Sequence, residues 1–405
     1  MSTISFENTE YAFEYKTDAA LKKARFLFSS MGYPWLVKLG TRLTPWAMKI
    51  GLPINGLLRR TLFGQFVGGE TLQETAKVAD TLERFSVKVI LDYGVEGKEG
   101  ELSFDNACEE FIRVINFAAT QPNIPFMSIK VTGFARFGLL EKLDAAARPG
   151  FGIEGKLSLE VLNDEERKEW SRVETRMEKI ITVAANNNVG VLVDAEESWI
   201  QDPVDALTMQ MMQKYNATKA IVYNTVQLYR HDRLLFLQAS HERARQQQFI
   251  LGVKLVRGAY MEKERKRAVA LNYLSTIQPD KTASDQNYNA AVEYAVSNLN
   301  NIAVIVASHN EQSNLLATDL LRQYGFPFDH PHIHFSQLYG MSDNITFNLA
   351  KAGCSVSKYL PFGPIKDVIP YLMRRAQENS SVSGHTGREL GLIKKELRRR
   401  KQSRD

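Results

Sequence analysis

The sequence predicts an α/β protein in which eight parallel strands close into a (βα)8 barrel, preceded by an N-terminal helical segment. From about residue 86, eight short runs rich in β-branched residues alternate with longer amphipathic or polar stretches. Their starts lie 22 to 64 residues apart, which leaves room for one crossover helix between successive parallel strands. Eight such units in just under 300 residues favour a closed barrel over an open sheet. The predicted strands are residues 90–95, 126–131, 190–196, 220–227, 252–258, 303–309, 332–338 and 354–360.

Composition and charge indicate a globular protein and exclude several functional classes. The 405 residues are 44% apolar and 24% charged, which excludes a disordered or collagen-like chain. A net charge of +5 is too small to indicate a dedicated nucleic-acid-binding protein. No apolar run reaches the ~18 to 20 residues of a membrane span, and the acidic first eighteen residues are unlike a signal or transit peptide. Because Cys108 and Cys354 form no paired motif, a reducing compartment is indicated.

Positive charge is concentrated at both ends of the chain. Residues 388–405 hold eight basic and three acidic groups, and residues 19–69 hold eight basic groups and no acidic one. Basic residues interleaved with Trp35, Trp46 and many leucines are typical of helices that lie on an anionic membrane surface. The alternative is a helical subdomain packed on the body, because Pro34, Pro45 and Pro53 are expected to break the segment into short helices. We expect an N-terminal helical segment (1–85), a catalytic barrel (86–387) and a basic C-terminal tail (388–405).

Polar side chains occupy the late positions of the predicted strands. A strand buried on both faces should stay apolar, and burial of polar groups without a purpose is costly. In a (βα)8 barrel the active site lies at the C-terminal ends of the strands, so these residues are the first indication of function. They are Lys130, Asp194, Gln227, Lys254, Arg257, His309, Asn310 and Tyr359.

A second candidate feature is a helix that we expect to open at Pro370. Tyr371, Arg374, Arg375 and Glu378 have the spacing of one helical face. Two adjacent guanidinium groups beside one carboxylate favour binding of a further anion, because arginine offers a planar fork that matches a carboxylate or phosphate. The alternative is a solvated helix with a weak Arg374 to Glu378 salt bridge.

Three histidines in the run His330-Pro-His332-Ile-His334 raise a different possibility. Alternate residues of a strand point the same way, so such histidines could bind a divalent metal for hydrolysis. They fall at the start of their predicted strand, however, which is the end opposite a barrel's active site. A metal-dependent barrel hydrolase is kept as an alternative function.

Several motifs together resemble the proline dehydrogenase family. They are Gly252-Val-Lys-Leu-Val-Arg-Gly-Ala-Tyr260 followed by Glu262 and Glu264, the run Tyr359-Leu-Pro-Phe-Gly363, and Tyr371 to Asn379, with weaker likeness in Phe66-Val-Gly-Gly-Glu70. The resemblance covers roughly residues 80–380. It implies a distorted (βα)8 barrel of the TIM type that binds FAD at its strand ends. It also implies oxidation of L-proline to Δ1-pyrroline-5-carboxylate, with electrons passed to a membrane quinone.

The resemblance also assigns roles to individual residues. It makes Lys130, Arg374 and Arg375 the groups that bind the proline carboxylate. Further substrate-pocket positions are Asp194, Tyr260, Leu338, Tyr359 and Tyr371. The flavin's reactive edge corresponds to Gln227 and to Lys254, which replaces an arginine of the bacterial bifunctional members. Other FAD contacts are Val256, Gly258, Ala259, Lys281, Ser284, His309, Asn310, Arg375 and Glu378. No metal ion is expected.

The resemblance finally implies a substrate, partners and a location. Tyr359 matches the tyrosine of proline-specific members, whereas hydroxyproline-oxidising relatives tend to have a smaller residue there, so proline is favoured over hydroxyproline. No extension of aldehyde dehydrogenase length follows, so a separate pyrroline-5-carboxylate dehydrogenase is expected to take the product. We expect a cytoplasmic enzyme that is peripheral on the inner face of the membrane, with the matrix side of the mitochondrial inner membrane as the alternative. No nucleic acid partner is expected.

Overall fold

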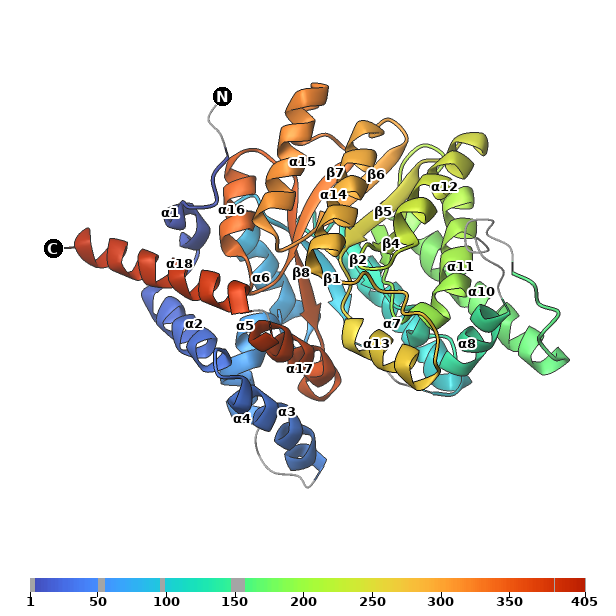
Figure 1. Ribbon diagram of the computed structural model, residues 1–405, viewed down its shortest axis with the longest axis horizontal. Helices are drawn as coiled ribbons and strands as arrows, with labels where there is room; N and C mark the ends of the chain where they lie inside the picture. The colour runs from blue at the N-terminus through green and yellow to red at the C-terminus, as the bar shows by residue number, and fades with distance from the viewer. Residues whose placement is uncertain (1–3, 50–54, 95–98, 147–156, 382, 405) are drawn as a thin grey trace. The chain divides into compact units, whose positions relative to one another are not determined.

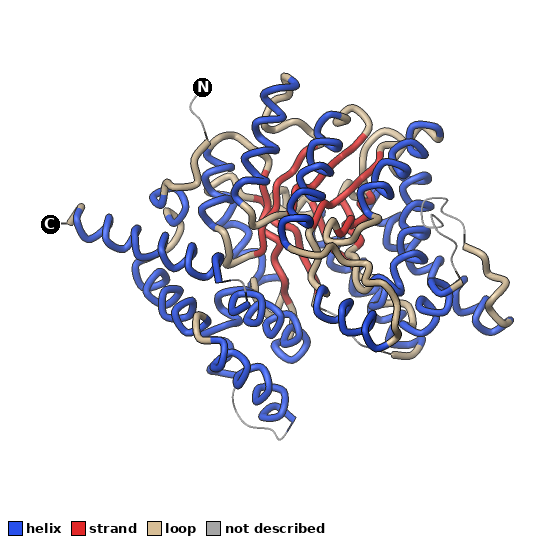
Figure 2. Tube along the Cα trace, in the orientation of Figure 1, coloured by secondary structure: helices blue, strands red, loops and turns tan. Residues whose placement is uncertain are grey.

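The eight predicted strands all form, and they close into one parallel barrel in the order β1 to β8. The computed structural model describes residues 4–49, 55–94, 99–146, 157–381 and 383–404 (Figure 1). Figure 2 shows the strands in red and the helices that follow them in blue. The strands are β1 (Lys88–Tyr93), β2 (Phe126–Ile129), β3 (Gly190–Val193), β4 (Val222–Gln227), β5 (Leu251–Val256), β6 (Ile302–Ala307), β7 (Ile333–Leu338) and β8 (Val356–Phe362).

Five strands end two or three residues before the predicted positions. Gln227, Lys254 and Tyr359 lie within their strands, whereas the other polar residues assigned to the strand ends already belong to the following segments, because the chain there turns toward the next helix. After β2, for example, the chain forms a short 3-10 turn (Val131–Gly133), and Asn310 caps the helix that follows β6. Asp194 and His309 therefore lie just beyond their strands.

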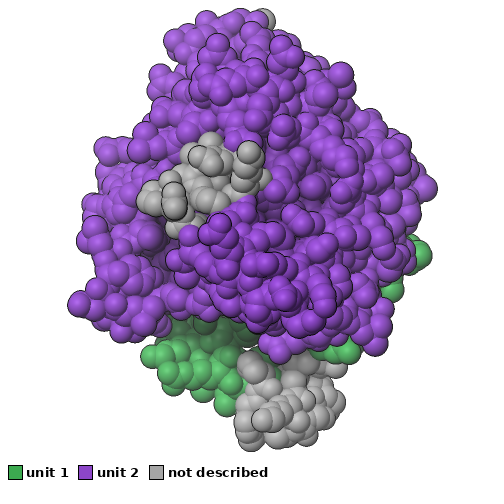
Figure 3. Space-filling model, turned by 90° about the vertical axis from the view of Figure 1, so that its right-hand side faces the viewer, with its two compact units in different colours: residues 1–94, 337–405 green, residues 95–336 purple. Residues whose placement is uncertain are grey.

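The chain divides into two compact units (Figure 3). Unit 1 comprises Met1–Gly94 and Gln337–Asp405, and unit 2 comprises Val95–Ser336. The sequence analysis divided the chain after residues 85 and 387 on the basis of composition, and that division stays a prediction. In the part of the chain that the structure describes, no helix is both long enough and apolar enough to cross a membrane.

Unit 2 alternates strands β2 to β6 with amphipathic helices. Side-chain caps begin three of the helices: α10 has a capping box between Asn163 and Glu166, and Asp280 and Asn310 cap α14 and α15. The helices are α7 (Glu101–Ala119), α8 (Phe137–Ala145), α10 (Asp164–Asn186), α11 (Gln201–Tyr215), α12 (Arg233–Gln246), α13 (Met261–Ala270), α14 (Lys281–Ser297) and α15 (Glu311–Tyr324), with a 3-10 turn at Ser198–Ile200.

An aromatic layer fills the early part of the strands in unit 2. The ring of Phe126 contacts those of Tyr223 and His334, at centroid distances of 5.7 and 5.1 Å. Gly190 makes room for this layer, because a Cβ atom there would lie 2.4 Å from the Phe126 ring. Side chains alternate along a strand, so the same faces present polar residues further on, where β3 and β5 end.

Unit 1 contains the N-terminal helices and the C-terminal helices. Its hydrophobic core joins residues from both ends of the chain, including Phe28, Phe66, Leu372 and Ile393. The helices are α1 (Thr9–Phe13), α2 (Asp18–Met31), α3 (Pro34–Lys49), α4 (Asn55–Leu58), α5 (Gly64–Phe66), α6 (Leu72–Glu83), α16 (Asp343–Lys351), α17 (Ile365–Ser381) and α18 (Ser383–Gln402), with a π turn at Arg59–Phe63.

Two of the helix boundaries predicted from proline are wrong. Pro34 does open α3, but Pro45 lies inside that helix, and Pro53 falls outside the described residues. Pro370 does not open a helix either, because α17 begins at Ile365, directly after Pro364. The apolar residues of the first turns explain the earlier start, since they join the core of unit 1 and hold the helix despite the missing N–H of Pro370.

Candidate active site

A buried ion pair lies where strands β3 and β5 end in unit 2. Lys254 of β5 donates through Nζ to Oδ1 of Asp194, the residue that follows β3. The two side chains are only 6% and 13% exposed. Burial of two charges is costly unless they are paired, so this pair at the strand ends is a candidate functional feature. Both residues were predicted from the sequence as members of the site.

Gln227 is the last residue of β4, the strand that lies between β3 and β5 in the barrel. Its side chain has a polar atom without a hydrogen-bond partner among the described residues. Its side chain is 2% exposed, and its Nε2 donates to the carbonyl of Glu196 at 3.0 Å. That contact fixes the orientation of the amide, and Oε1 then has no hydrogen-bond partner among the described residues. A buried acceptor without a donor costs about 1 to 3 kcal/mol. The arrangement therefore suits a bound molecule that brings a polar hydrogen.

Lys130 lies at the end of β2, and the loop that follows it is tied to the β3 loop. Lys130 is half-buried and precedes the turn Val131–Gly133. Two residues later, Thr132 donates from Oγ1 to Oε1 of Glu196 at 2.7 Å. The backbone N–H of Glu196 in turn donates to Oε1 of Gln201 at 3.3 Å. Glu196 thus connects the ends of β2, β3 and β4.

The segment after β5 contains the predicted positions from Val256 to Tyr260. Val256 is half-buried, Ala259 is exposed, and Gly258 adopts a φ of +134°. A Cβ atom at Gly258 would lie 2.4 Å from the ring of Tyr229, so a larger residue does not fit there. Tyr260 is half-buried and directly precedes α13.

Arg257 lies between Val256 and Gly258, and its side chain binds other side chains of the protein. Its Nε donates to Asp285 at 2.6 Å, and its two terminal nitrogens donate to the hydroxyls of Ser308 and Ser313 at 2.7 and 3.0 Å. Its guanidinium carbon also lies 4.3 Å from the centroid of the Tyr288 ring. These contacts give Arg257 a structural role, as a link from β5 to α14 and α15.

The remaining predicted cofactor contacts in unit 2 have partners within the protein. Lys281 is largely exposed and pairs with Asp285 of its own helix, while Ser284 donates to the carbonyl of Asp280 at 3.0 Å. Asn310 accepts through Oδ1 from the backbone N–H of Ser313 at 3.0 Å and so caps α15. His309 is half-buried in the loop before that cap. A structural function accounts for Ser284 and Asn310, and their role as cofactor contacts stays a prediction.

In unit 1, helix α17 brings the predicted anion-binding face together. Arg375 is 7% exposed; its Nη2 donates to Oε1 of Glu378 at 2.5 Å, and its guanidinium carbon lies 5.2 Å from the Tyr371 ring centroid. Burial raises the pKa of Glu378, and the nearby Arg375 and Arg374 oppose that rise. Burial likewise raises the pKa of Tyr371, whose hydroxyl has no hydrogen-bond partner among the residues described. The face therefore combines buried positive charge with an unsatisfied hydroxyl.

The last two predicted positions in unit 1 lie on β7 and β8. Leu338 ends β7 and packs against the core of unit 1. Tyr359 of β8 is half-buried, and its carbonyl accepts from the backbone N–H of Tyr339 at 2.9 Å. Its backbone is thus fixed by the loop that follows β7.

Comparison with known proteins decides the family. A family model described as proline dehydrogenase matches residues 75–388. The chain belongs to the proline dehydrogenase family. The resemblance predicted from the motifs is thereby confirmed, as is the barrel fold.

Curated relatives cover most of the chain. It is 34% identical to "Proline dehydrogenase 1, mitochondrial" of Dictyostelium discoideum, over 87% of this chain and 67% of that protein. It is 36% identical to "Carbapenem antibiotics biosynthesis protein CarD" of Pectobacterium carotovorum subsp. carotovorum, over 83% of each. The hydroxyproline dehydrogenase of Xenopus laevis is 32% identical over 96% of this chain and 88% of that protein.

Solved structures show the same fold at low identity. The crystal structure of proline utilization A (PutA) from Bdellovibrio bacteriovorus, inactivated by N-propargylglycine, matches with a TM-score of 0.70 and 19% identity. The match covers 92% of this chain and 38% of that chain. The chain thus spans less than two fifths of the length of that PutA.

The histidines of the hydrolase alternative have other contacts in this proline dehydrogenase family member. His332 contacts the carbonyl of Leu299 through Nδ1 at 2.6 Å, and His334 belongs to the aromatic layer with Phe126. Nδ1 of His330 accepts from the backbone N–H of His332 at 3.2 Å. No group of three or more potential metal ligands occurs within the described ranges.

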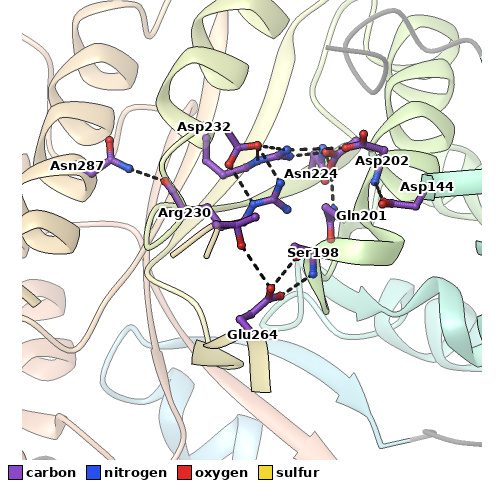
Figure 4. Close-up of polar contacts among 12 residues, drawn as sticks. Asp144, Ser198, Gln201, Asp202, Asn224, Arg230, Asp232, Glu264 and Asn287 are labelled. Carbon is purple, nitrogen blue, oxygen red and sulfur yellow. Dashed lines mark hydrogen bonds and ion pairs between the residues drawn. The ribbon is translucent and has the colours of Figure 1, made fainter. Parts of the chain in front are cut away.

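Several residues around the site were missed by the sequence analysis. Figure 4 shows a polar network in which Glu264 accepts from Ser198. Gln201 and Asn224 both donate to Oδ1 of Asp205 and are connected through it. Glu196 has a similar bridging role. Only Glu264 carried a signal, since it belongs to the motif that marks proline dehydrogenases. The others lie on separate elements: Glu196 and Ser198 follow β3, Gln201 and Asp205 belong to α11, and Asn224 belongs to β4. No local pattern shows that the fold brings these elements together.

Proposed function

We propose that this protein is an FAD-dependent dehydrogenase that oxidises L-proline to Δ1-pyrroline-5-carboxylate. The reaction removes a hydride from the ring carbon next to nitrogen and a proton from the amine, and it leaves a C=N bond. FAD, when bound, accepts the hydride. The observation that carries the proposal is the buried Lys254–Asp194 pair beside the unsatisfied Gln227, at the strand ends of a proline dehydrogenase family barrel.

The residues at the ends of β4 and β5 fit a flavin. Gln227 offers a buried acceptor to a group that brings an N–H, as the flavin ring does. Lys254 places a positive charge within a nearly buried site, where it would stabilise the negative charge of a reduced ring. Asp194 holds the Lys254 ammonium in place. We therefore propose Gln227 and Lys254 as the residues next to the reactive edge, with the backbone of residues 256–259 alongside.

The carboxylate of proline requires cationic groups, and each unit offers candidates. In unit 1, Arg375 keeps one nitrogen on Glu378, and a guanidinium has further N–H groups for a second carboxylate. Arg374 is its neighbour on α17. In unit 2, Lys130 is the candidate. Tyr371 would contribute its hydroxyl, which finds no acceptor in the described part of the protein.

Hydroxyproline is the second candidate substrate. Hydroxyproline dehydrogenases of Xenopus laevis and Bos taurus are 32% and 31% identical to this chain over nearly all of its length. Proline is favoured by Tyr359, because the family resemblance associates a tyrosine there with proline. The family resemblance also assigns Leu338 of unit 1, and Asp194 and Tyr260 of unit 2, to substrate binding.

We further propose that the electrons pass to a membrane quinone, with the protein docked at the membrane surface. Helix α3 exposes Trp35, Leu36, Leu39 and Leu43, which are 65%, 40%, 49% and 48% accessible. Lys38 and Arg42 are exposed on the same helix, as expected for binding to anionic lipid. The inner face of a bacterial membrane and the matrix side of the mitochondrial inner membrane both fit this surface. A separate pyrroline-5-carboxylate dehydrogenase would consume the product.

A steady-state assay with a redox dye tests the proposed function. Purified protein should contain one FAD and reduce the dye with L-proline at a kcat/KM at least tenfold above that with hydroxyproline. The variant Tyr359→Ser should narrow this ratio. A higher kcat/KM for hydroxyproline in the unaltered protein would make the second candidate the correct one, and activity that depends on added divalent metal would contradict both.

A further inference from the structure

The loop after β3, residues 194–198, joins most of the proposed site residues of unit 2. Asp194 pairs with Lys254, and Glu196 contacts Thr132 and Gln227. A shift of this loop would therefore move the charge partner of Lys254 and the anchor of Gln227 together. The backbone N–H of Asp194 still donates to the carbonyl of Ile129 in β2 at 2.8 Å, but the strand register ends at Val193. The position of the following residues therefore needs another support.

That support comes from Glu264 of helix α13. The carboxylate is 1% exposed and accepts twice from Ser198: the backbone N–H donates to Oε1 at 2.7 Å, and the hydroxyl donates to Oε2 at 2.7 Å. Thr276 adds a longer contact to Oε2, at 3.4 Å. A buried carboxylate is costly unless such donors satisfy it, so both oxygens are committed to holding this loop (Figure 4).

The main chain of Glu264 contacts the other side of the proposed pocket. Its backbone N–H donates to the carbonyl of Tyr260 at 2.9 Å, in the first turn of α13. Glu264 therefore connects Tyr260 to the loop that carries Asp194. The neighbouring Lys263 pairs with Glu197, and the guanidinium of Arg267 lies 4.3 Å from the Trp199 ring, so α13 contacts the end of the loop and the 3-10 turn that follows it.

We propose that Glu264 is a positioning residue, which fixes the β3 loop and Tyr260 relative to each other and thereby sets the affinity for substrate. This inference rests on the proposed function. Because Glu264 holds Asp194 and Tyr260 and does not itself belong to the reacting groups, its removal should weaken substrate binding more than it slows hydride transfer.

The test compares Glu264→Gln with Glu262→Gln in the full-length flavoprotein. Both variants remove one negative charge from α13, but Glu262 is exposed and forms no hydrogen bond or ion pair within the described residues. We expect Glu264→Gln to raise KM for proline at least tenfold while kcat falls less than threefold. Glu262→Gln should leave both within twofold. A KM within twofold of the unaltered protein in Glu264→Gln, or an equal rise in Glu262→Gln, would overturn the proposal.

Ser198→Ala provides a milder second variant if Glu264→Gln fails to fold. It removes one of the two donors, so KM should rise about three- to fivefold. Added to Glu264→Gln, it should change KM by less than a further twofold, because both substitutions break the same contact. An unchanged KM in Ser198→Ala, or full additivity in the double variant, would contradict the proposal.

Hydrogen exchange separates failure of this inference from failure of the proposed function. The Ser198 amide should exchange at least tenfold faster in Glu264→Gln than in Glu262→Gln, whether or not proline is the substrate. Unchanged protection would refute the support of the loop by Glu264. An unaltered protein that contains flavin but does not react with proline would instead refute the proposed function.

Discussion

The segments that form helices α3 and α18 of unit 1 were both predicted to be basic, but the basic side chains of the two helices differ in their ion pairs. Helix α18 buries Leu392 and Ile393 and directs its cations toward acidic residues near the N-terminus. Helix α3 leaves large apolar side chains exposed, and its Lys38 and Arg42 have no ion pair among the described residues. The ion pairs that join α18 and the turn after it to the N-terminal residues are Arg388 and Lys395 with Glu7, Arg399 with Glu10, and Arg400 and Arg404 with Asp18.

The comparison teaches that net charge along a sequence does not show which cations are available to a partner. Residues 1–18 carry −3 and residues 388–405 carry +5, and the two segments largely neutralise each other across the contact of α1 and α2 with α18. The +8 of residues 19–69 has no comparable acidic partner within its own segment. The surface for anionic lipid is therefore proposed on α3 and not on α18.

The largest effect is expected from the double variant Trp35→Glu and Leu39→Glu in α3. Removing two side chains from a membrane interface and adding charge should weaken binding to anionic vesicles by about 3 to 4 kcal/mol, or several hundredfold. Vesicle sedimentation measures this loss. Leu102→Glu in α7, where the leucine is 76% exposed, is the matched control and should leave binding unchanged. Equal losses in both proteins would show that α3 is not the membrane surface.

A loss of stability, rather than of membrane binding, is expected from Glu396→Ala in α18. This carboxylate is fully buried and accepts from Arg399 and Arg400 at 2.7 to 2.9 Å. Because both arginines retain some solvent contact, we expect the free energy of unfolding in urea to fall by about 2 to 3 kcal/mol. Vesicle binding should not change. Glu83→Ala, at the exposed end of α6, serves as the control and should cost less than ~0.5 kcal/mol.

Docking of α18 is also expected to depend on pH through Glu389. Burial, together with the nearby Asp343, raises the pKa of Glu389 to about 7, although it accepts from the backbone N–H of Ser342 and lies near Lys358 and Lys16. A carboxyl whose pKa is higher in the folded than in the unfolded protein favours folding when protonated. Stability should therefore fall as pH rises from about 4.5 to about 7, by on the order of 2 to 3 kcal/mol.

Glu389→Gln is the variant that tests this dependence. Urea unfolding between pH 4.5 and 8 should show a flatter profile in the variant than in the unaltered protein. Asp343 does not interfere in this window: burial raises its pKa, but Lys16 and Lys358 outweigh burial and lower it to about 2. Its stabilising contribution is lost only at lower pH. Identical slopes in both proteins would contradict the role of Glu389.

The smallest effects are expected from substitution of single arginines, one in α3 and one directly after α18. Arg42→Gln in α3 should weaken binding to anionic vesicles about fivefold, since one cation near such a surface contributes about 1 kcal/mol. Arg404→Gln, in the turn directly after α18, should leave binding unchanged and alter stability by less than ~0.5 kcal/mol, because its pair with Asp18 is 70% exposed on the arginine side. If Arg404→Gln lost more vesicle binding than Arg42→Gln, the membrane surface would lie near α18 and not on α3.

The sequence predicted the barrel and its strands well, because periodic burial is a local signal. It predicted the ends of strands less well: Asp194 and Arg257 were counted as strand residues, but the chain had already turned into a loop. The helical face of α17 that is predicted to bind an anion was identified from helical spacing, although Pro370 misplaced the start of that helix. Each of these depends on residues that are close along the chain.

Contacts between distant segments could not be predicted from one sequence. Glu264 and Ser198 are 66 positions apart, and Arg388 pairs with a residue 381 positions away. Composition separated residues 388–405 as a tail, but it could not show that α18 (Ser383–Gln402) buries Leu392 and Ile393 in the core of unit 1. Such pairings depend on the fold that brings the segments together, and no local pattern encodes them.

An anaerobic titration of the purified protein with L-proline tests the central claim most directly. The account predicts a flavin spectrum that bleaches with one equivalent of proline per flavin and a product two hydrogens lighter than the substrate. Lys254→Met, which removes the charge beside Asp194, should bleach at least tenfold more slowly. A protein without flavin, or a flavin spectrum that excess proline leaves unchanged, would contradict the account.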